Sequence, residues 1–120
     1  MKVLKIIEAK NTLEILLEKP GMNTQTALMI LANYNDVCKV YDTLAPKQNE
    51  IIKFHSLVSS NGEKSLTPEG KQKMMELMMK DVNFTCDHLI PVRGLDPAGL
   101  SPHELSTILF LLDLGGKNNE

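Results

Sequence analysis

The longest regular pattern of apolar residues begins after Asn23 and repeats at alternating spacings of three and four. Two of its ten positions, Gln48 and His55, are polar, and the other eight are Ala27, Ile30, Tyr34, Val37, Tyr41, Leu44, Ile51 and Val58. This spacing is typical of a helix with one apolar stripe, and over several heptads it is typical of a coiled coil. We therefore expect one long helix over residues 24–58, capped by the side chain of Asn23.

Pro46 interrupts this long helical pattern. Proline lacks the N–H group that an interior helical position donates, and its ring collides with the carbonyl four residues earlier. We therefore expect the helix either to kink or to divide near Thr43–Ala45.

The clearest turn of the sequence lies directly after the long helix. Asn61-Gly62 supplies the positive φ angles that a tight reversal needs. Thr67 and Pro68 then form an N-cap and a first helical residue, so a second long helix is expected to begin there. Because the chain reverses between them, the two helices should form an antiparallel hairpin. The apolar residues of the second helix are Met74, Met75, Leu77, Met78 and Met79.

Two segments have the composition or the period of a β-strand. Val3–Ile7 is short and rich in β-branched residues, and a short helix is expected to follow it from Asn11 to the turn at Lys19-Pro20-Gly21. Val82–Val92 alternates apolar and polar residues, which is typical of a half-buried strand. Pro91 cannot donate to a sheet, so this strand should lie at an edge or end there. We expect the two strands to pair.

The last helix has the strongest local signal. In Ser101-Pro102-His103-Glu104 the serine and the glutamate can form a capping box. A buried helix should follow, ended by Gly115-Gly116. Together, the patterns predict an α+β fold: an antiparallel long helical hairpin, packed with a small two-stranded or slightly larger sheet and a C-terminal helix. Residues 1–116 are expected to form a single α+β domain and residues 117–120 a flexible polar tail.

Composition narrows the classes of function. The 120 residues carry a net charge of −2, which does not favour a polyanionic or polycationic partner. No apolar run approaches the ~20 residues that cross a bilayer, and Lys5 and Glu8 interrupt the start too early for a signal peptide. Cys38 and Cys86 are too few for a disulfide scaffold. We expect a cytoplasmic protein with reduced thiols and no membrane contact.

A catalytic centre has weak support. Cys86 and His88 would share one face of a strand, and a small hydrolase or transferase built on them is an alternative, but a buried cysteine is far more often part of a core. The histidines and cysteines lack the close spacings of metal ligands, and no phosphate-binding glycine motif is present. We therefore predict no catalytic residues, no metal and no cofactor.

Nucleic-acid binding is a second weak alternative. The lysines that could contact phosphates are interleaved with carboxylates, which is more typical of an ordinary solvated face. The lysines in question are Lys64, Lys71, Lys73 and Lys80.

The methionine cluster is the most unusual feature of the composition. Four of the seven methionines lie within six residues, and methionine is flexible and common on surfaces that accommodate partners. The alternative to a partner surface is that the methionines fill gaps in the core of the helical hairpin. Five apolar residues in six, however, cannot all face one neighbouring helix. We predict a non-enzymatic protein-binding module, with a protein partner and homo-oligomer formation as a further option. The predicted partner-binding residues are Met74, Met75, Met78, Met79, Tyr34 and Tyr41.

The order of several motifs resembles a family of small bacteriophage and prophage proteins of unassigned function. The likeness covers about Pro20 to Asp113, with Asn49–His55, Asn61-Gly62 and Leu100–Leu105 as its most specific parts. The sequence departs from the family at Ala45-Pro46, where charged helix formers are expected. The family offers no catalytic residues to carry over. The resemblance implies a phage setting: an inhibitor or regulator of a host or defence protein, or an assembly factor, in the cytoplasm of the bacterial host.

Overall fold

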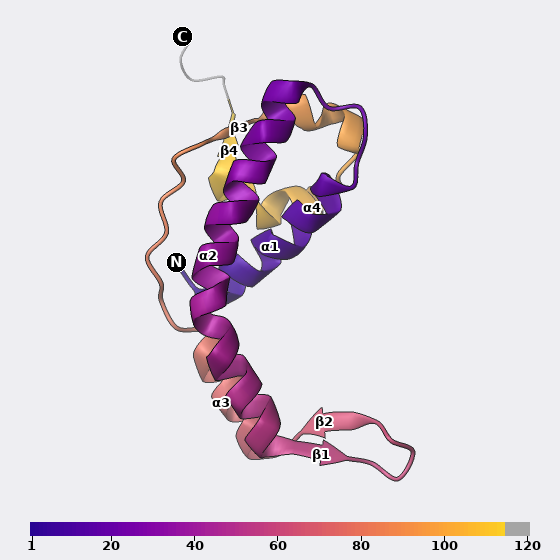
Figure 1. The fold of residues 1–120 in the computed structure, drawn as a ribbon, viewed down its shortest axis with the longest axis vertical. Helices are drawn as coiled ribbons and strands as arrows, with labels where there is room; N and C mark the ends of the chain where they lie inside the picture. Colours follow the sequence, from indigo (N-terminus) through magenta and orange to yellow (C-terminus); the bar gives the residue numbers. More distant parts are fainter. Residues whose placement is uncertain (115–120) are drawn as a thin grey trace.

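A 32-residue helix, α2, runs the length of the molecule, and the other elements pack along it (Figure 1). The computed structural model describes residues 1–114 and measures 56 × 30 × 22 Å. The fold is α+β, with a long helix pair, a small antiparallel sheet and a C-terminal helix, as predicted. The elements, in chain order, are α1 (Val3–Leu17), α2 (Thr24–His55), β1 (Ser56–Val58), β2 (Lys64–Leu66), α3 (Pro68–Met78), β3 (Ile90–Pro91), the 3₁₀ helix η1 (Val92–Ala98), α4 (Pro102–Thr107), the 3₁₀ helix η2 (Leu109–Leu111) and β4 (Leu112–Asp113).

α2 begins and continues as its pattern predicts but ends earlier. The Asn23 side chain accepts a hydrogen bond of 2.8 Å from the N–H of Thr26, which confirms the cap. The helix is not divided at Pro46, and its axis changes direction in its second half (Figure 1), so it bends rather than splits. The predicted extension to Val58 is wrong, because the chain turns into strand β1 at Ser56.

The predicted strand at Val3–Ile7 is wrong, because these residues form the first turns of helix α1. The predicted helix start at Asn11 therefore falls in the middle of α1. The fully buried residues of α1 follow spacings of three and four, so a helix buries all of them on one face, which a strand would not do. Packing thus overrides the β-propensity of a few branched residues. The buried apolar residues are Val3, Ile6, Ala9, Leu13 and Leu16.

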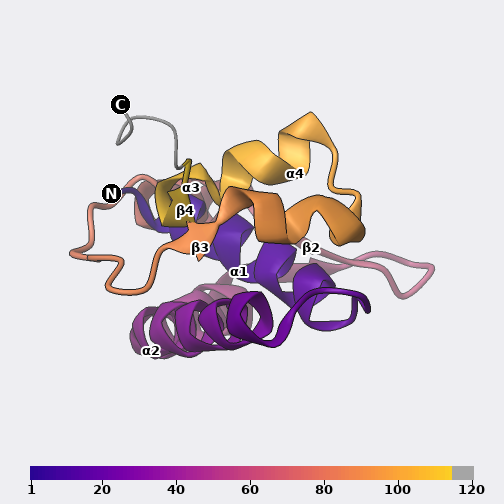
Figure 2. The ribbon, with the colours of Figure 1, turned by 90° about the horizontal axis from the view of Figure 1, so that it is seen from above.

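α1 forms the middle layer of the molecule, between α2 on one side and the segment from β3 to β4 on the other (Figure 2). The main core lies around the buried stripe of α1, and its buried residues are Ile6, Ala9, Leu13, Leu16, Ile30, Val37, Ile90, Leu95, Ala98, Ile108, Leu111 and Leu112. A hydrogen bond inside this core joins α1 to α4. Because the Thr107 hydroxyl donates to the Glu104 carbonyl, the Thr12 hydroxyl is the donor to Thr107.

The predicted strand at Val82–Val92 is also wrong in its extent and its partner. Only Ile90–Pro91 forms a strand, β3, and it pairs in parallel with β4. The N-terminal segment is helical and offers no partner strand. The residues directly before the two segments, Lys2 and Asp81, form an isolated antiparallel bridge. The alternation still marks burial, since Phe84 packs against the main core while its neighbours are exposed.

The helical hairpin is present but unequal. α3 runs back along the second half of α2, as predicted, yet it has 11 residues and is not a second long helix. The Thr67 hydroxyl accepts a 3.0 Å hydrogen bond from the N–H of Gly70, which confirms the cap. A Cβ at position 70 would lie 2.5 Å from the Cβ of His55, so only glycine allows this close approach to α2. Val3, Leu44 and Leu77 form a second, smaller core here.

The reversal between α2 and α3 contains the antiparallel sheet. Strands β1 and β2 pair on either side of the Asn61-Gly62 turn, where Gly62 has a φ of 86°. The turn prediction is confirmed. The sheet, however, belongs to this turn and not to the two segments that the sequence suggested.

The C-terminal helix begins as predicted and ends sooner. Both hydrogen bonds of the Ser101–Glu104 capping box are present. The predicted helix up to Gly115-Gly116 is too long, because α4 ends at Thr107 and the chain continues as η2 and β4. The two glycines and the predicted tail at 117–120 lie outside the described residues.

Candidate protein-binding surface

The four clustered methionines, three in α3 and Met79 at its C-cap, divide into an inner and an outer pair. Met74 and Met78 are half-buried and pack against the second core, whereas the side chains of Met75 and Met79 are 66% and 53% exposed. The geometry follows from the helix, because Leu77 faces α2 and Met75 lies roughly 200° around the axis from it. Helix α3 therefore presents two flexible thioether side chains to solvent.

These methionines line an open groove with a volume of about 460 Å³. Leu4 of α1 and Leu66 of β2 line it together with residues of α3, so three elements contribute to the groove. Lys71 is its one charged residue, and the rest of the lining is apolar. We call the set Leu4, Leu66, Lys71, Met74, Met75, Met78 and Met79 the methionine groove.

The two tyrosines predicted to join this surface lie elsewhere. The Tyr34 hydroxyl donates a 3.0 Å hydrogen bond to Oε2 of Glu14, and Lys10 Nζ donates to the same oxygen at 2.8 Å. The Lys10 ammonium also lies 4.7 Å from the ring centre of Tyr41. The structure thus brings together four of the six predicted partner-binding residues, while Tyr34 and Tyr41 hold α2 against α1.

The ionisation of this tyrosine cluster follows from its hydrogen bonds. Those from Lys10 and then Tyr34 lower the pKa of Glu14, and the bond to Glu14 raises the pKa of Lys10. Hydrogen bonds with Cys38 and then with Glu14 raise the pKa of Tyr34. Glu14 and Lys10 are therefore charged at neutral pH and Tyr34 is protonated, which suits a clamp between two helices.

The candidate nucleophile Cys86 contacts an amide. Its thiol donates a 3.2 Å hydrogen bond to Oδ1 of Asn33, and burial raises the pKa of the thiol, which favours the unreactive protonated form. The buried Asn33 amide in turn donates to the carbonyls of Met29 and His88, at 2.8 and 2.6 Å. This network fastens residues 86–88 to α2. Within residues 1–114, no group of three or more metal-ligating side chains converges.

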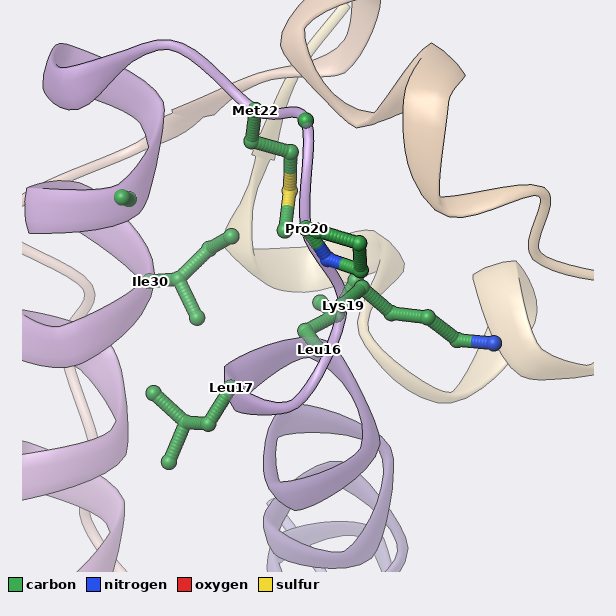
Figure 3. A pocket seen from close by; sticks show the side chains of 8 residues that line it. Leu16, Leu17, Lys19, Pro20, Met22 and Ile30 are labelled. Atoms are coloured by element: carbon green, nitrogen blue, oxygen red, sulfur yellow. The ribbon is translucent and has the colours of Figure 1, made fainter.

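A smaller pocket of about 200 Å³ lies where α1 ends and α2 begins (Figure 3). Leu17 and Ile30 approach it from the two helices, Met22 reaches over it from the connecting loop, and the ammonium group of Lys19 points away. Polar and apolar atoms share its wall about equally, and Figure 3 shows no charged group directed into it. It offers no constellation for chemistry.

A charged groove separates the other side of α3 from α2. Three lysines and two glutamates share it, so it presents no uniform charge to a phosphate backbone. Lys47 lies close enough to lower the pKa of Lys80. Of the lysines considered for nucleic-acid contact, Lys73 and Lys80 line this groove and Lys71 lies in the methionine groove.

The sequence patterns did not identify a second set of exposed apolar residues. It lies on the arm, which consists of the end of α2, the hairpin of β1 and β2, and the start of α3. Of this set, the sequence pattern places only Val58 on the apolar stripe of the long helix, whereas the chain leaves the helix at Ser56 and Val58 is exposed. An uncharged run directly before the Asn-Gly turn is the signal that could have revealed them. The members of the set are Ile52, Phe54, Leu57 and Val58.

No protein-family model matches the chain, and no significant match was found among curated proteins or solved structures. The resemblance to small phage proteins therefore stays a prediction from the order of motifs. Among residues 1–114, no helix combines the length and the apolar content of a membrane span.

Proposed function

We propose that the chain is a non-enzymatic protein-binding module whose methionine groove receives an apolar segment of another protein. The carrying observation is that Met75 and Met79 project from α3 into solvent beside two half-buried methionines, in a groove with one charged residue. Contiguous exposed apolar surface marks interaction sites in folded proteins. Unbranched methionine side chains adapt to different partner shapes.

The shape of the groove favours a helical partner segment. It follows one face of a helix, and an amphipathic helix can lay its own apolar stripe along such a surface. In the phage setting that the motif order implies, the partner would be a host or defence protein or a virion component. The module would then act in the host cytoplasm as an inhibitor, a regulator or an assembly factor.

A paired-variant capture experiment tests this function. The purified protein is immobilised and incubated with lysate of the bacterial host, and retained proteins are identified by mass spectrometry. A Met75→Gln/Met79→Gln variant should retain at least tenfold less of the specific partner, since polar amides replace the apolar contact while the buried side of α3 is untouched.

The matched control changes two exposed polar positions on the same helix, Gln72→Ala/Lys73→Ala, and should capture as the wild type does. Titration calorimetry with the identified partner then gives the affinity of each variant. Equal capture by the wild type and the methionine variant, with both folded by circular dichroism, would contradict the proposal.

A further inference from the structure

Strands β1 and β2 form a hairpin that projects from the end of the arm (Figure 1). Within the described residues this sheet has two strands, and an isolated two-stranded hairpin is marginally stable in water. Exposed side chains lie on β1, with Leu57 53% and Val58 64% accessible. Within residues 1–114, neither outer edge of the hairpin pairs with a further strand, so both are open to one.

The hydrogen-bond register identifies the free groups on β1. The N–H of Thr67 donates to the His55 carbonyl at 2.7 Å, and the N–H of Ser59 donates to the Glu63 carbonyl at 2.8 Å. Because hydrogen-bonded pairs recur at every second residue, Leu57 also directs its backbone groups toward β2. Ser56 and Val58 therefore direct their N–H and C=O groups outward.

The two edges differ in charge. The β2 edge carries Lys64, next to Glu63, and an edge lysine opposes pairing with a second strand. The β1 edge has no charged side chain from Ser56 to Ser60. Pairing of β2 with itself would bring lysines together across the axis, whereas pairing of β1 with itself brings no like charges together.

We propose that β1 pairs with β1 of a second copy of this chain, antiparallel about a twofold axis at Leu57, to make a four-stranded sheet. The edge is self-complementary, since Ser56 and Val58 flank Leu57 symmetrically. Ser56 of each copy then lies opposite Val58 of the other, and the two pairs exchange four backbone hydrogen bonds. Leu57 faces its own counterpart in the close, non-hydrogen-bonded pair.

The available area sets the strength of this dimer. A standard interface buries about 800 Å² per partner, and a three-residue strand with its few apolar side chains supplies roughly half of that. We therefore expect a weak dimer, with a dissociation constant on the order of 100 μM. The inference does not depend on the methionine groove, because no residue of β1 lines that groove.

Sedimentation velocity between about 10 μM and 1 mM gives the first test. The wild type should shift from monomer to dimer over this range. Val58→Pro removes an outward N–H that the hairpin does not use, so the dimer should weaken at least tenfold while the hairpin persists. Lys64→Pro removes the equivalent outward N–H on the β2 edge and should leave dimerisation unchanged.

Cross-linking gives a test that does not require the proline variants to fold. Opposed residues at a non-hydrogen-bonded position have Cα atoms about 4.5 Å apart, within the range of a disulfide. In a Cys38→Ser/Cys86→Ser background, Leu57→Cys should form a disulfide-linked dimer under mild oxidation at least tenfold more than Ser65→Cys.

Three outcomes would overturn the inference: a monomer at every concentration, a dimer that Val58→Pro leaves intact, or equal cross-linking at positions 57 and 65. Loss of the dimer in the Met75→Gln/Met79→Gln variant alone would assign self-association to the groove instead. That last result would leave the capture experiment as the separate test of partner binding.

Discussion

Asn33 shows how one buried polar side chain fixes a segment that has no regular structure. Its amide is buried and has partners in α2 and in the chain at residues 86–88, so the segment is held without a sheet. In sequence, Asn33 is an ordinary polar position beside an apolar stripe. Its partner at residue 88 lies 55 positions away, and no local pattern identifies it.

Asn33→Ala should lower the free energy of unfolding by about 2–3 kcal/mol, because the His88 carbonyl and the Cys86 thiol lose their partner while remaining partly shielded from water. Urea denaturation monitored by circular dichroism measures the change. Asn35→Ala, at an exposed position of the same helix, should change stability by less than about 0.5 kcal/mol. Equal effects of the two substitutions would show that the network contributes nothing.

Glu14 gives a second prediction at this scale. Its pKa is lowered in the folded protein, so its contribution is present above the pKa of the unfolded chain, about 4.3, and is lost as pH falls through the lower folded value. Stability measured between pH 6 and pH 3 should therefore fall more steeply in the wild type than in Glu14→Gln. Identical slopes in that window would refute the assignment.

At the scale of elements, what the sequence predicted correctly is local chemistry. The caps at Asn23, Thr67 and Ser101 and the turn at Gly62 depend on atoms within a few residues, so their residue types suffice to identify them. Three of the helix starts and the reversal of the hairpin follow from these signals. The clustered methionines were recognised in the same way, because their crowding on one helix is visible in the sequence.

The errors concern elements that long-range packing determines. Val3–Ile7 has strand composition, but burial between α2 and the C-terminal segment selects a helix. Once α1 is helical, the alternating segment at residues 82–89 has no strand to pair with. The separation of the tyrosines from the methionines also depends on α1. Its Glu14 accepts the hydrogen bond from Tyr34, and its Lys10 lies over the ring of Tyr41. None of this is encoded within a short window.

Pro46 gives the prediction that belongs to α2. The helix runs through this residue although proline removes one backbone hydrogen bond, and its exposed position accommodates the ring. Pro46→Ala restores the donor and should raise the free energy of unfolding by about 1–3 kcal/mol. Thermal and urea unfolding measure the change, with Lys47→Ala as the neighbouring control. A lower stability would mean that the bend is needed for the packing of α3.

At the scale of the whole molecule, two apolar clusters of unequal size share one long helix. The main core lies around the buried stripe of α1, and the second core has three buried members. Val40 and Val82 are half-buried side chains that pack against both clusters. Beyond the second core, the arm consists of the end of α2, the β hairpin and the start of α3, with much of its apolar surface exposed. Less buried apolar surface therefore stabilises the arm, so the arm resists local unfolding less than the main core does.

Each protein chain leaves the ribosome in sequence order, and this has a consequence for α1. α1 leaves the ribosome before most of the other described residues, yet its buried stripe is enclosed partly by residues from 90 to 112. During synthesis α1 can pack first against α2 and then against α3, and the part of its stripe that faces residues 90–112 is covered only once those residues have been made. This apolar surface therefore stays in contact with water while α2 and α3 are being made, and the main core is complete only when β3, α4 and β4 arrive.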